Sequence, residues 1–371
     1  MLQLAVAFLL LGAQDAPPKV DPKKVDAAID KGAKALLRDV KRGVMALPHP
    51  THGAMSRDEL VLYTLIHAGV DANDETFKSL VARVLKNELK HVYSVALMAM
   101  ALEALDRRAH QSRIAECAQF LVDNQCANGQ WSYGSPVPAD RKTATPGSKP
   151  APKSGSTEAL PTITIARRGR GPATGDNSNS QYAALGLRAC LESGVRIPQD
   201  VLADAEKWWE QSQRKDGGWG YDISPVAVDE SYGSMTAGAV GSLVICKHYL
   251  KEEFTKARSV QAGLKWLASN FSVTENPRAP QESRTMWHYY WLYALERAGL
   301  LYGTETMGAH EWYPEGAEFL LAKQRANGTW SGDSLMSLLP DAGPDTCFAI
   351  LFLRRATKPV RDVASVDPRK K

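Results

Sequence analysis

Polar side chains suited to acid–base chemistry or ligand binding recur at the starts of apolar, helix-forming stretches. A helix N-terminus carries partial positive charge and unpaired N–H groups, so it favours carboxylates and anionic ligands. Asp, Asn and Ser are also preferred N-cap residues, so a capping role and a functional role are both open at each position. The residues concerned are His91, Tyr93, Asp176, Asn177, Asn179, Asp229, Glu230, Tyr232, Glu282, Arg284, His288, Tyr289, Asp341 and Asp345.

Two carboxylates that face each other across a cleft are the machinery of glycoside hydrolysis. Glu230, Glu282 and Asp345 stand at the starts of three different apolar stretches, and a closed helical fold would let them converge. Together with Asp341 and His288 they are the catalytic candidates. None of them belongs to a stronger motif, because GxSxG, HExxH, CxxC and Gly-rich phosphate-binding patterns are absent.

The elements that must position these side chains are indicated by an internal repeat. Three segments share one pattern, in which an aromatic residue precedes a Gln by five positions, and a Gly and a Trp follow that Gln by four and six. The residues are Phe120, Gln125, Gly129 and Trp131, then Trp208, Gln213, Gly217 and Trp219, then Phe319, Gln324, Gly328 and Trp330. Self-similarity of this kind indicates a fold built from repeated supersecondary units.

Each copy of the pattern has the features of a helix terminus. The aromatic residue belongs to the buried stripe of an amphipathic helix, which an Asn/Asp-Gly pair then ends. The Gln can bond backbone groups left unpaired at that end, and the Trp folds back over it. We therefore expect these residues to be structural clamps, because a buried Trp is mostly a packing residue.

Helix pairs follow from the same repeat. A second, more apolar helix follows each clamp, over 180–190, 236–249 and 346–353, and its Ala/Gly/Leu composition suits burial on most sides. Degenerate pairs are 25–39 with 59–69, 76–89 with 92–105, and 259–270 with 287–299. The sequence thus predicts an all-α fold, an α/α toroid of about six helix pairs over residues 25–356, closed so that no helix edge is left unpaired.

The clamp pattern resembles the QW repeat of the squalene cyclase and protein prenyltransferase superfamily, whose members are α/α toroids. The resemblance implies an isoprenoid ligand in a central cavity. The DxDD and DDxxD elements of terpene cyclases are absent, because no two Asp residues are adjacent. The resemblance to prenyltransferases implies a zinc site at Asp345 and Cys347, which match Asp-x-Cys, although no later helix supplies the His ligand. The aromatic run 287–293 points in several directions around its helix, so most of it is expected to pack.

Composition and charge exclude several classes of protein. The 371 residues are 44% hydrophobic and 23% charged, which excludes wholesale disorder. Lys and Arg number 45 against 41 Asp and Glu, a net charge of +4, so a dedicated nucleic-acid binder is not expected. The Cys count of 5 is odd and sparse, which does not indicate a disulfide framework. We expect no cofactor.

Three segments are expected to lie outside the ring. Residues 1–16 resemble a signal peptide, because an apolar run is followed by small residues and prolines, and this predicts export to the periplasm or the medium. Residues 135–175 contain seven prolines, seven Lys/Arg and no aromatic residue, which predicts a mobile basic loop. Residues 357–371 are expected to form a basic, disordered tail.

The sequence therefore favours an exported repeat protein, without an assigned catalytic activity, that binds an apolar or extended ligand, or a protein, in its central cavity. The alternative is an isoprenoid-processing enzyme of the terpene cyclase type, and a glycan-processing enzyme is the third reading. We expect no nucleic-acid partner and no membrane-spanning segment beyond the signal. The oligomeric state is open.

Overall fold

The computed structural model describes residues 20–43, 46–49, 53–135, 160–221, 230–331 and 343–360, with the backbone alone at 46–49, 53–56 and 282–283. The fold is 61% helix and 3% strand, with 13 helices among the described residues. The predicted all-α class is therefore confirmed.

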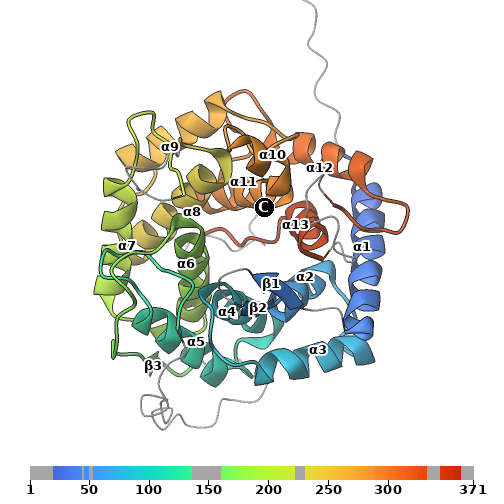
Figure 1. Ribbon diagram of the computed structural model, residues 1–371, viewed down its shortest axis with the longest axis horizontal. Coiled ribbons are helices and arrows are strands. Elements are labelled where there is room, and N and C mark those ends of the chain that lie inside the picture. The colour runs from blue at the N-terminus through green and yellow to red at the C-terminus, as the bar shows by residue number, and fades with distance from the viewer. Residues whose placement is uncertain are drawn as a thin grey trace, which may run out of the picture.

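Six helices form an inner circle around a central axis (Figure 1). They are α2 (Asp58–Ala68), α4 (Val92–Asp106), α6 (Asn177–Glu192), α8 (Gly233–Leu250), α11 (His288–Tyr302) and α13 (Gly343–Arg354). Each contacts the next in this order and α13 contacts α2, so the circle is closed. The outer helices are α1 (Pro22–Arg42), α3 (Glu75–Lys86), α5 (Gln111–Asp123), α7 (Gln199–Gln211), α9 (Arg258–Ser269) and α12 (Trp312–Lys323). The α/α toroid of six pairs is as predicted.

Inner and outer helices differ in composition as their burial requires. In α8 every residue from Gly233 to Lys247 is buried, and most are small or aliphatic. Outer helix α1 instead buries one stripe that recurs with helical spacing and exposes charged residues on its other side. It begins at the N-cap Asp21, which accepts the N–H of Lys23, and ends at Gly43 in the left-handed conformation.

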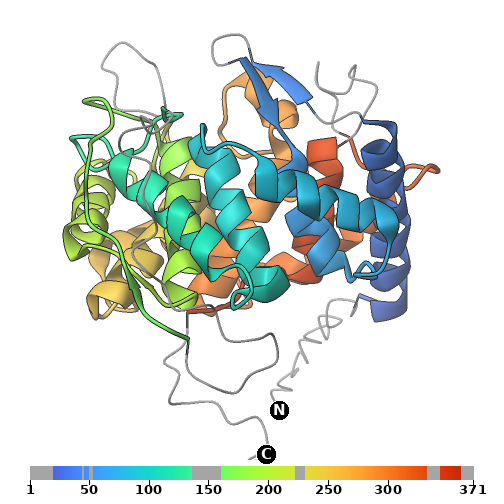
Figure 2. The ribbon, with the colours of Figure 1, turned by 90° about the horizontal axis from the view of Figure 1, so that it is seen from below.

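Short elements that the sequence did not indicate decorate the ring. The strands β1 (Ala46–His49) and β2 (Gly53–Ser56) pair antiparallel, with Ala46 opposite Ser56. Figure 2 shows this hairpin projecting beyond the helices at the end where α2 begins. The helix α10 (Gln281–Met286) precedes α11, and β3 (Ile163–Thr164) pairs in parallel with β4 (Val195–Arg196).

The Trp of each clamp joins an outer helix to its own inner helix. Its indole N–H donates to a carbonyl ten residues earlier in the outer helix, and its backbone N–H donates to a hydroxyl in the first turn of the inner helix. The indole pairs are Trp131 with Leu121 at 2.7 Å, Trp219 with Trp209 at 2.8 Å and Trp330 with Leu320 at 2.7 Å. The hydroxyls belong to Ser180, Thr236 and Thr346. All three indoles are fully buried, so they are structural, as expected.

The Gln of each clamp joins consecutive repeats. Its Nε2 donates to the carbonyl of the clamp Gly and to a carbonyl near the start of the next outer helix. The latter bonds are Gln125 to Val201, Gln213 to Ser259 and Gln324 to Ala28, each at 2.8 Å. The predicted role, pairing with backbone groups at the end of the Gln's own helix, is present in the bond to the clamp Gly, and the bond to the following outer helix adds to it.

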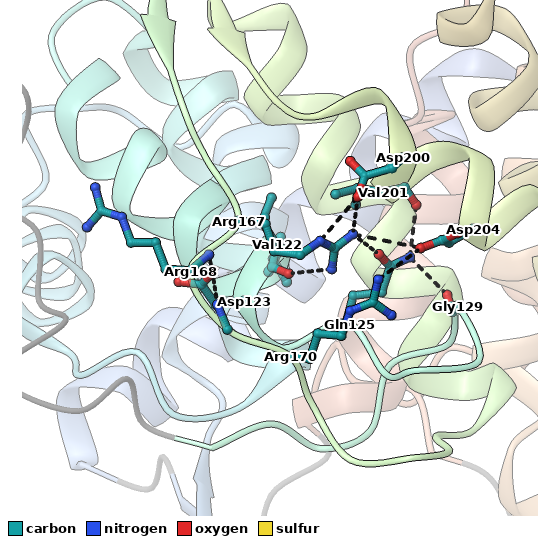
Figure 3. A network of polar contacts seen from close by, with 12 residues as sticks. Val122, Asp123, Gln125, Gly129, Arg167, Arg168, Arg170, Asp200, Val201 and Asp204 are labelled. Carbon is teal, nitrogen blue, oxygen red and sulfur yellow. Dashed lines mark hydrogen bonds and ion pairs between the residues drawn. The ribbon is translucent and has the colours of Figure 1, made fainter.

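Residues 160–175 form a strap along the outside of the ring between α5 and α7 (Figure 3). The backbone N–H groups of Arg168 and Gly169 donate to Oδ1 of Asp123 at 2.7 and 3.0 Å. The strap therefore closes over the end of α5, where the helix would otherwise face solvent.

The strap also contacts the first clamp. The Nη2 atom of Arg167 donates to Oε1 of Gln125 at 2.9 Å and forms an ion pair with Asp200 at 3.1 Å (Figure 3). The expectation of a mobile loop over 135–175 does not hold for this part, because these bonds hold it against the ring. Residues 136–159 lie outside the described residues.

The first residues of the expected C-terminal tail are bonded to the ring. The N–H and hydroxyl of Thr357 donate to Glu296 at 2.9 and 2.7 Å, and Lys358 pairs with Glu103 at 2.7 Å. Residues 357–360 are thus fixed rather than part of a disordered tail, whereas 361–371 lie outside the described residues. The expected signal peptide, 1–16, lies outside them too. Among the described helices, none combines the length and hydropathy needed to cross a bilayer.

Candidate functional site

The inner helices start at a common end of the ring, because each is reached through an outer helix that carries the chain back. Side chains from the first turns of α4, α6 and α11 meet there, as do Gly343 of α13 and Arg57 before α2. We call this end the ring mouth. Six helix N-termini at one place make the mouth electropositive, through the partial charges of their N–H groups.

The mouth combines an exposed indole with a group of hydroxyls. Trp287, the N-cap residue of α11, is a large apolar side chain that is 42% exposed. Its ring makes an edge contact with Tyr290 at 6.3 Å between centroids. The Tyr290 hydroxyl lies 3.2 Å from that of Ser178 and 3.4 Å from that of Tyr93, and Tyr93 and Ser178 are hydrogen-bonded to each other. Aromatic faces thus continue from the surface into the ring.

Asp176 is the carboxyl group two residues before Ser178. It is the N-cap of α6, and its two oxygens accept the backbone N–H and the Nδ2 of Asn179, each at 2.8 Å. The expected capping role is therefore present. Burial raises the pKa of Asp176 above its ordinary value, against the hydrogen bonds from Asn179, which lower it. Burial, and the nearby charge of Asp176, also raise the pKa of Tyr93.

A guanidinium lies deeper on the axis, within a group of phenol rings. Arg297 of α11 is 2% exposed and lies nine residues after the helix start, roughly 13 Å along it at the helical rise. Its Cζ lies 4.3 Å from the ring centroid of Tyr293, 5.2 Å from that of Tyr182 and 6.0 Å from that of Tyr290. Its Nη2 donates to Oε1 of Gln181 at 2.7 Å.

This guanidinium has an incomplete set of partners. The Nη1 of Arg297 has no hydrogen-bond partner among the described residues, and no described carboxylate forms an ion pair with it. Cation–π contacts with the three tyrosines offset part of the cost of burying the charge. The sequence does carry a signal for the Arg297 guanidinium, because residues 296 and 297 are two charged residues inside an otherwise apolar helix. They were not singled out from the sequence.

The opposite end of the axis is closed by the residues that follow α13. A cavity of about 20 Å³ remains there, lined among others by Tyr63, His67, Glu103 and Lys358. This volume holds about one water molecule. Burial lowers the pKa of His67 to about 4, so its ring is neutral at neutral pH. A larger ligand would therefore reach the axis from the mouth.

Two of the predicted catalytic residues, Glu230 and His288, have contacts away from the tyrosines around Arg297. Glu230 is exposed and pairs with Arg278 at 3.1 Å, outside the ring of tyrosines. His288 is buried and donates from Nε2 to the carbonyl of Val273 at 2.9 Å, with its ring against Phe319 of an outer helix. Burial lowers the pKa of His288 to about 4. These contacts give both side chains structural roles.

Of the remaining predicted residues, the structure describes Asp345 and Cys347. Asp345 lies partly exposed in the first turn of α13, and Cys347, two residues later, is buried. The described residues contain no group of three His, Cys, Asp or Glu side chains placed to hold a metal ion. Asp229 and Asp341 lie outside the described residues, and the side chain of Glu282 is not described.

The other polar residues singled out from the sequence have mainly backbone-fixing roles. Asn177 donates from Nδ2 to the carbonyl of Gly220 at 2.9 Å. Arg284 donates from Nε to the carbonyl of Ala279 at 2.8 Å. Tyr232 and His91 are the N-cap residues of α8 and α4, and Tyr289 is buried within α11.

Comparison with known proteins finds similarity in structure only. No protein-family model matches the sequence, and no curated protein matches it. A variant of the type II terpene cyclase MstE from Scytonema, in its apo form, is 11% identical over 90% of this chain and 97% of its own, with a TM-score of 0.53. A MstE variant in complex with its substrate, geranylgeranyl dihydroxybenzoate, gives a TM-score of 0.54 at 11% identity, over 90% of this chain and 97% of its own.

A third similar structure is a possible member of the GH105 family from Salmonella enterica serovar Paratyphi A. It is 11% identical over 94% of this chain and 98% of its own, with a TM-score of 0.56. At such identities the likeness shows the fold alone, and it confirms the α/α toroid. Activity belongs to a site rather than to a fold, so it must be argued from the residues at the axis.

Proposed function

We propose that this protein binds an apolar, extended ligand of the isoprenoid type along the ring axis, and that the ligand enters at the ring mouth. The observation that carries the proposal is the exposed Trp287 in contact with Tyr290. A single exposed aromatic residue is ordinary. This one continues into buried rings, because Tyr290 contacts Phe348 at 5.6 Å and stacks with Tyr182 at 6.1 Å.

Two further observations support this direction of entry. The far end of the axis leaves room for about one water molecule, whereas the mouth presents aromatic faces with a few hydroxyls. Small-molecule sites have this character, with apolar walls and a few polar groups that fix orientation. The bound substrate in MstE gives a precedent within the same fold, and it is a property of that protein.

A second candidate function is protonation of an alkene in the bound ligand, with Asp176 as the acid. The buried carboxyl beside phenol rings favours it, because burial raises the pKa of Asp176. The charge on Arg297 opposes it. A carbocation about 6 Å from a guanidinium is destabilised by roughly 3 kcal/mol at an effective dielectric constant of about 20. Binding without cyclisation is therefore the function that the axis supports better.

Binding is tested by calorimetric titration of the purified protein with geranylgeraniol in detergent-free dispersion. We expect saturable binding at one site, and at least a tenfold loss of affinity in Trp287→Ala. The matched control is Phe254→Ala, which removes a half-buried aromatic ring packed against Tyr302 on the outside of the ring. Absence of binding, or equal losses in the two variants, would overturn the proposal.

Catalysis is tested by incubation with squalene and with geranylgeranyl diphosphate, each with and without magnesium. Asp176→Asn is the informative variant, because Asn also caps helices and keeps α6 intact. A cyclic product that this variant no longer forms would establish the second candidate. Recovery of unchanged substrate from the wild-type protein would exclude it.

We also propose that the protein is exported. The support is the apolar run within residues 1–16 and the prolines that follow it. N-terminal sequencing of the protein from its native source, after fractionation, tests the proposal. A mature chain that begins near residue 17 in the exported fraction is expected, and an intact N-terminus in the cytosolic fraction would refute it.

A further inference from the structure

Four polar atoms at the axis have no hydrogen-bond partner among the described residues, and they belong to Arg297, Gln181, Tyr182 and Tyr293. The Nη1 of Arg297 and the Nε2 of Gln181 have no partner among the described residues, and both side chains are 2% exposed. More than nine in ten buried polar groups in folded proteins are paired. The guanidinium and amide atoms can only donate a hydrogen bond, whereas the hydroxyls of Tyr182 and Tyr293 can donate or accept one. An acceptor group could therefore pair with all four atoms, which a donor group could not.

No ion pair with a described carboxylate compensates the charge of Arg297. The neighbouring carboxylate, Glu296, accepts both donors of Thr357 and so is turned to the C-terminal segment. Burial raises the pKa of Glu296 to about 7, which removes part of its negative charge at neutral pH. A buried cation without a charged partner is costly. An anion at Nη1 of Arg297 would compensate that cost through a charge-assisted hydrogen bond.

We propose that Arg297 and Gln181 form the head-group site for an oxyanion, a carboxylate or a phosphate, carried at the end of the apolar ligand. This inference rests on the proposed function and gives the bound ligand a direction. The anionic head lies at Arg297 and the apolar chain runs toward the mouth, with its far end at Trp287. Tyr290 contacts both Trp287 and Arg297, so its side chain must rotate for the ligand to pass.

The test compares two ligands that share one chain and differ in the head group. Geranylgeranoic acid and geranylgeraniol are titrated separately at pH 8, where the acid is ionised. We expect the wild-type protein to bind the acid at least tenfold more tightly than the alcohol. Arg297→Gln should remove this preference, and Arg297→Lys, which keeps the charge, should retain part of it.

The matched control is Arg107→Gln, which removes an exposed guanidinium bonded to the Glu192 carbonyl. It should leave the tenfold preference unchanged. Circular dichroism and thermal melting show whether each variant is folded. If Arg297→Gln does not fold, a pH series on the wild-type protein decides the question. The preference for the acid should then disappear as the pH falls below the carboxyl pKa of about 4–5.

Free anions separate the two sources of the oxyanion. Sodium acetate and inorganic phosphate, added without any lipid, should raise the melting temperature of the wild-type protein but not of Arg297→Gln if the site accepts free oxyanions. Stabilisation by the long-chain acid alone assigns the site to a head group. Equal affinity for acid and alcohol, or an unchanged preference in Arg297→Gln, would overturn the inference. If neither lipid binds, the proposed function fails. In that case the site at Arg297 is refuted as well only if free anions also give no response.

Discussion

The Nε2 of Gln324, in the last clamp, donates a hydrogen bond to the carbonyl of Ala28 in the first outer helix at 2.8 Å, across 296 positions of sequence. Gln125 makes the same bond to Val201, and Gln213 makes it to Ser259, both at 2.8 Å. The ring is therefore closed by the joint that also links neighbouring repeats along the chain.

Replacement of Gln324 by Ala should destabilise the protein measurably. Two hydrogen bonds are lost and two carbonyls are left without their donor, so we expect the free energy of unfolding to fall by about 1–3 kcal/mol. Urea denaturation followed by circular dichroism measures it. Gln211→Ala, at an exposed position at the end of α7, is the control and should change the stability by less than about 0.5 kcal/mol.

Gly129→Ala should be much more harmful than Gly43→Ala. Both glycines have positive φ, +94° and +75°. A Cβ on Gly129 would lie 2.2 Å from the carbonyl oxygen of Asp204, whereas nothing lies within 4 Å of one on Gly43. The left-handed backbone costs roughly 1–2 kcal/mol in both variants. Overpacking adds about 1–3 kcal/mol in Gly129→Ala alone. Equal melting temperatures would show that the first clamp can move away from α7.

Stability should depend on Glu296 between about pH 4 and pH 7. Burial raises the pKa of Glu296 to about 7, above its value in the unfolded chain. Between the two pKa values the folded state holds a proton that the unfolded state has lost. The contribution of this group therefore decreases as the pH rises through that window, on the order of 3 kcal/mol in total.

Glu296→Gln removes this dependence, so the stability of the variant minus that of the wild type should rise from pH 4.5 to 7 and then level off. The difference is needed because His67 and His288 act in the opposite sense. Burial lowers the pKa of both to about 4, so they add stability as the pH rises toward about 6.5. Glu318→Gln, at an exposed position, is the control. A flat difference for Glu296→Gln would contradict the assignment.

Arg167→Ala should loosen the strap without unfolding the ring. Arg167 links the strap to Gln125 and Asp200, as Figure 3 shows. We expect limited proteolysis within 160–175 to become at least several-fold faster, while the far-ultraviolet circular dichroism is unchanged. Thr162→Ala, at an exposed position of the same strap, should have little effect. Equal cleavage rates in the two variants would place the attachment elsewhere.

Most of the fold was predictable, because clamps and helix pairs are local patterns that repeat. The clamp spacing from Gln125 to Trp131 is readable in one copy and confirmed by two more. The partner of Gln125 was not readable, since Val201 lies in the next repeat. The strap was missed for a related reason. Its prolines and arginines predict an exposed loop, whereas backbone N–H groups, which every residue except proline has, attach it to Asp123.

The axis was predicted less well than the fold. Attention to polar residues at helix starts identified Asp176, and the structure places it as the N-cap of α6, two residues before Ser178, whose hydroxyl lies 3.2 Å from that of Tyr290. Arg297 escaped the search because it lies in the middle of a helix, where a charged residue commonly faces solvent. Only the closed circle of inner helices makes that position central, and closure depends on contacts between the first and last pairs.

The closing joint sets a constraint on synthesis. The ribosome synthesises α1 first, and α12 and α13 last. The bond from Gln324 to the carbonyl of Ala28 therefore forms only after nearly the whole polypeptide has emerged. During that interval the sides of α1 and α2 that later meet α12 and α13 have nothing to cover them. The nascent chain is therefore an open row of helix pairs with exposed apolar surface on its first pair. That surface is buried only when the final repeat closes the ring.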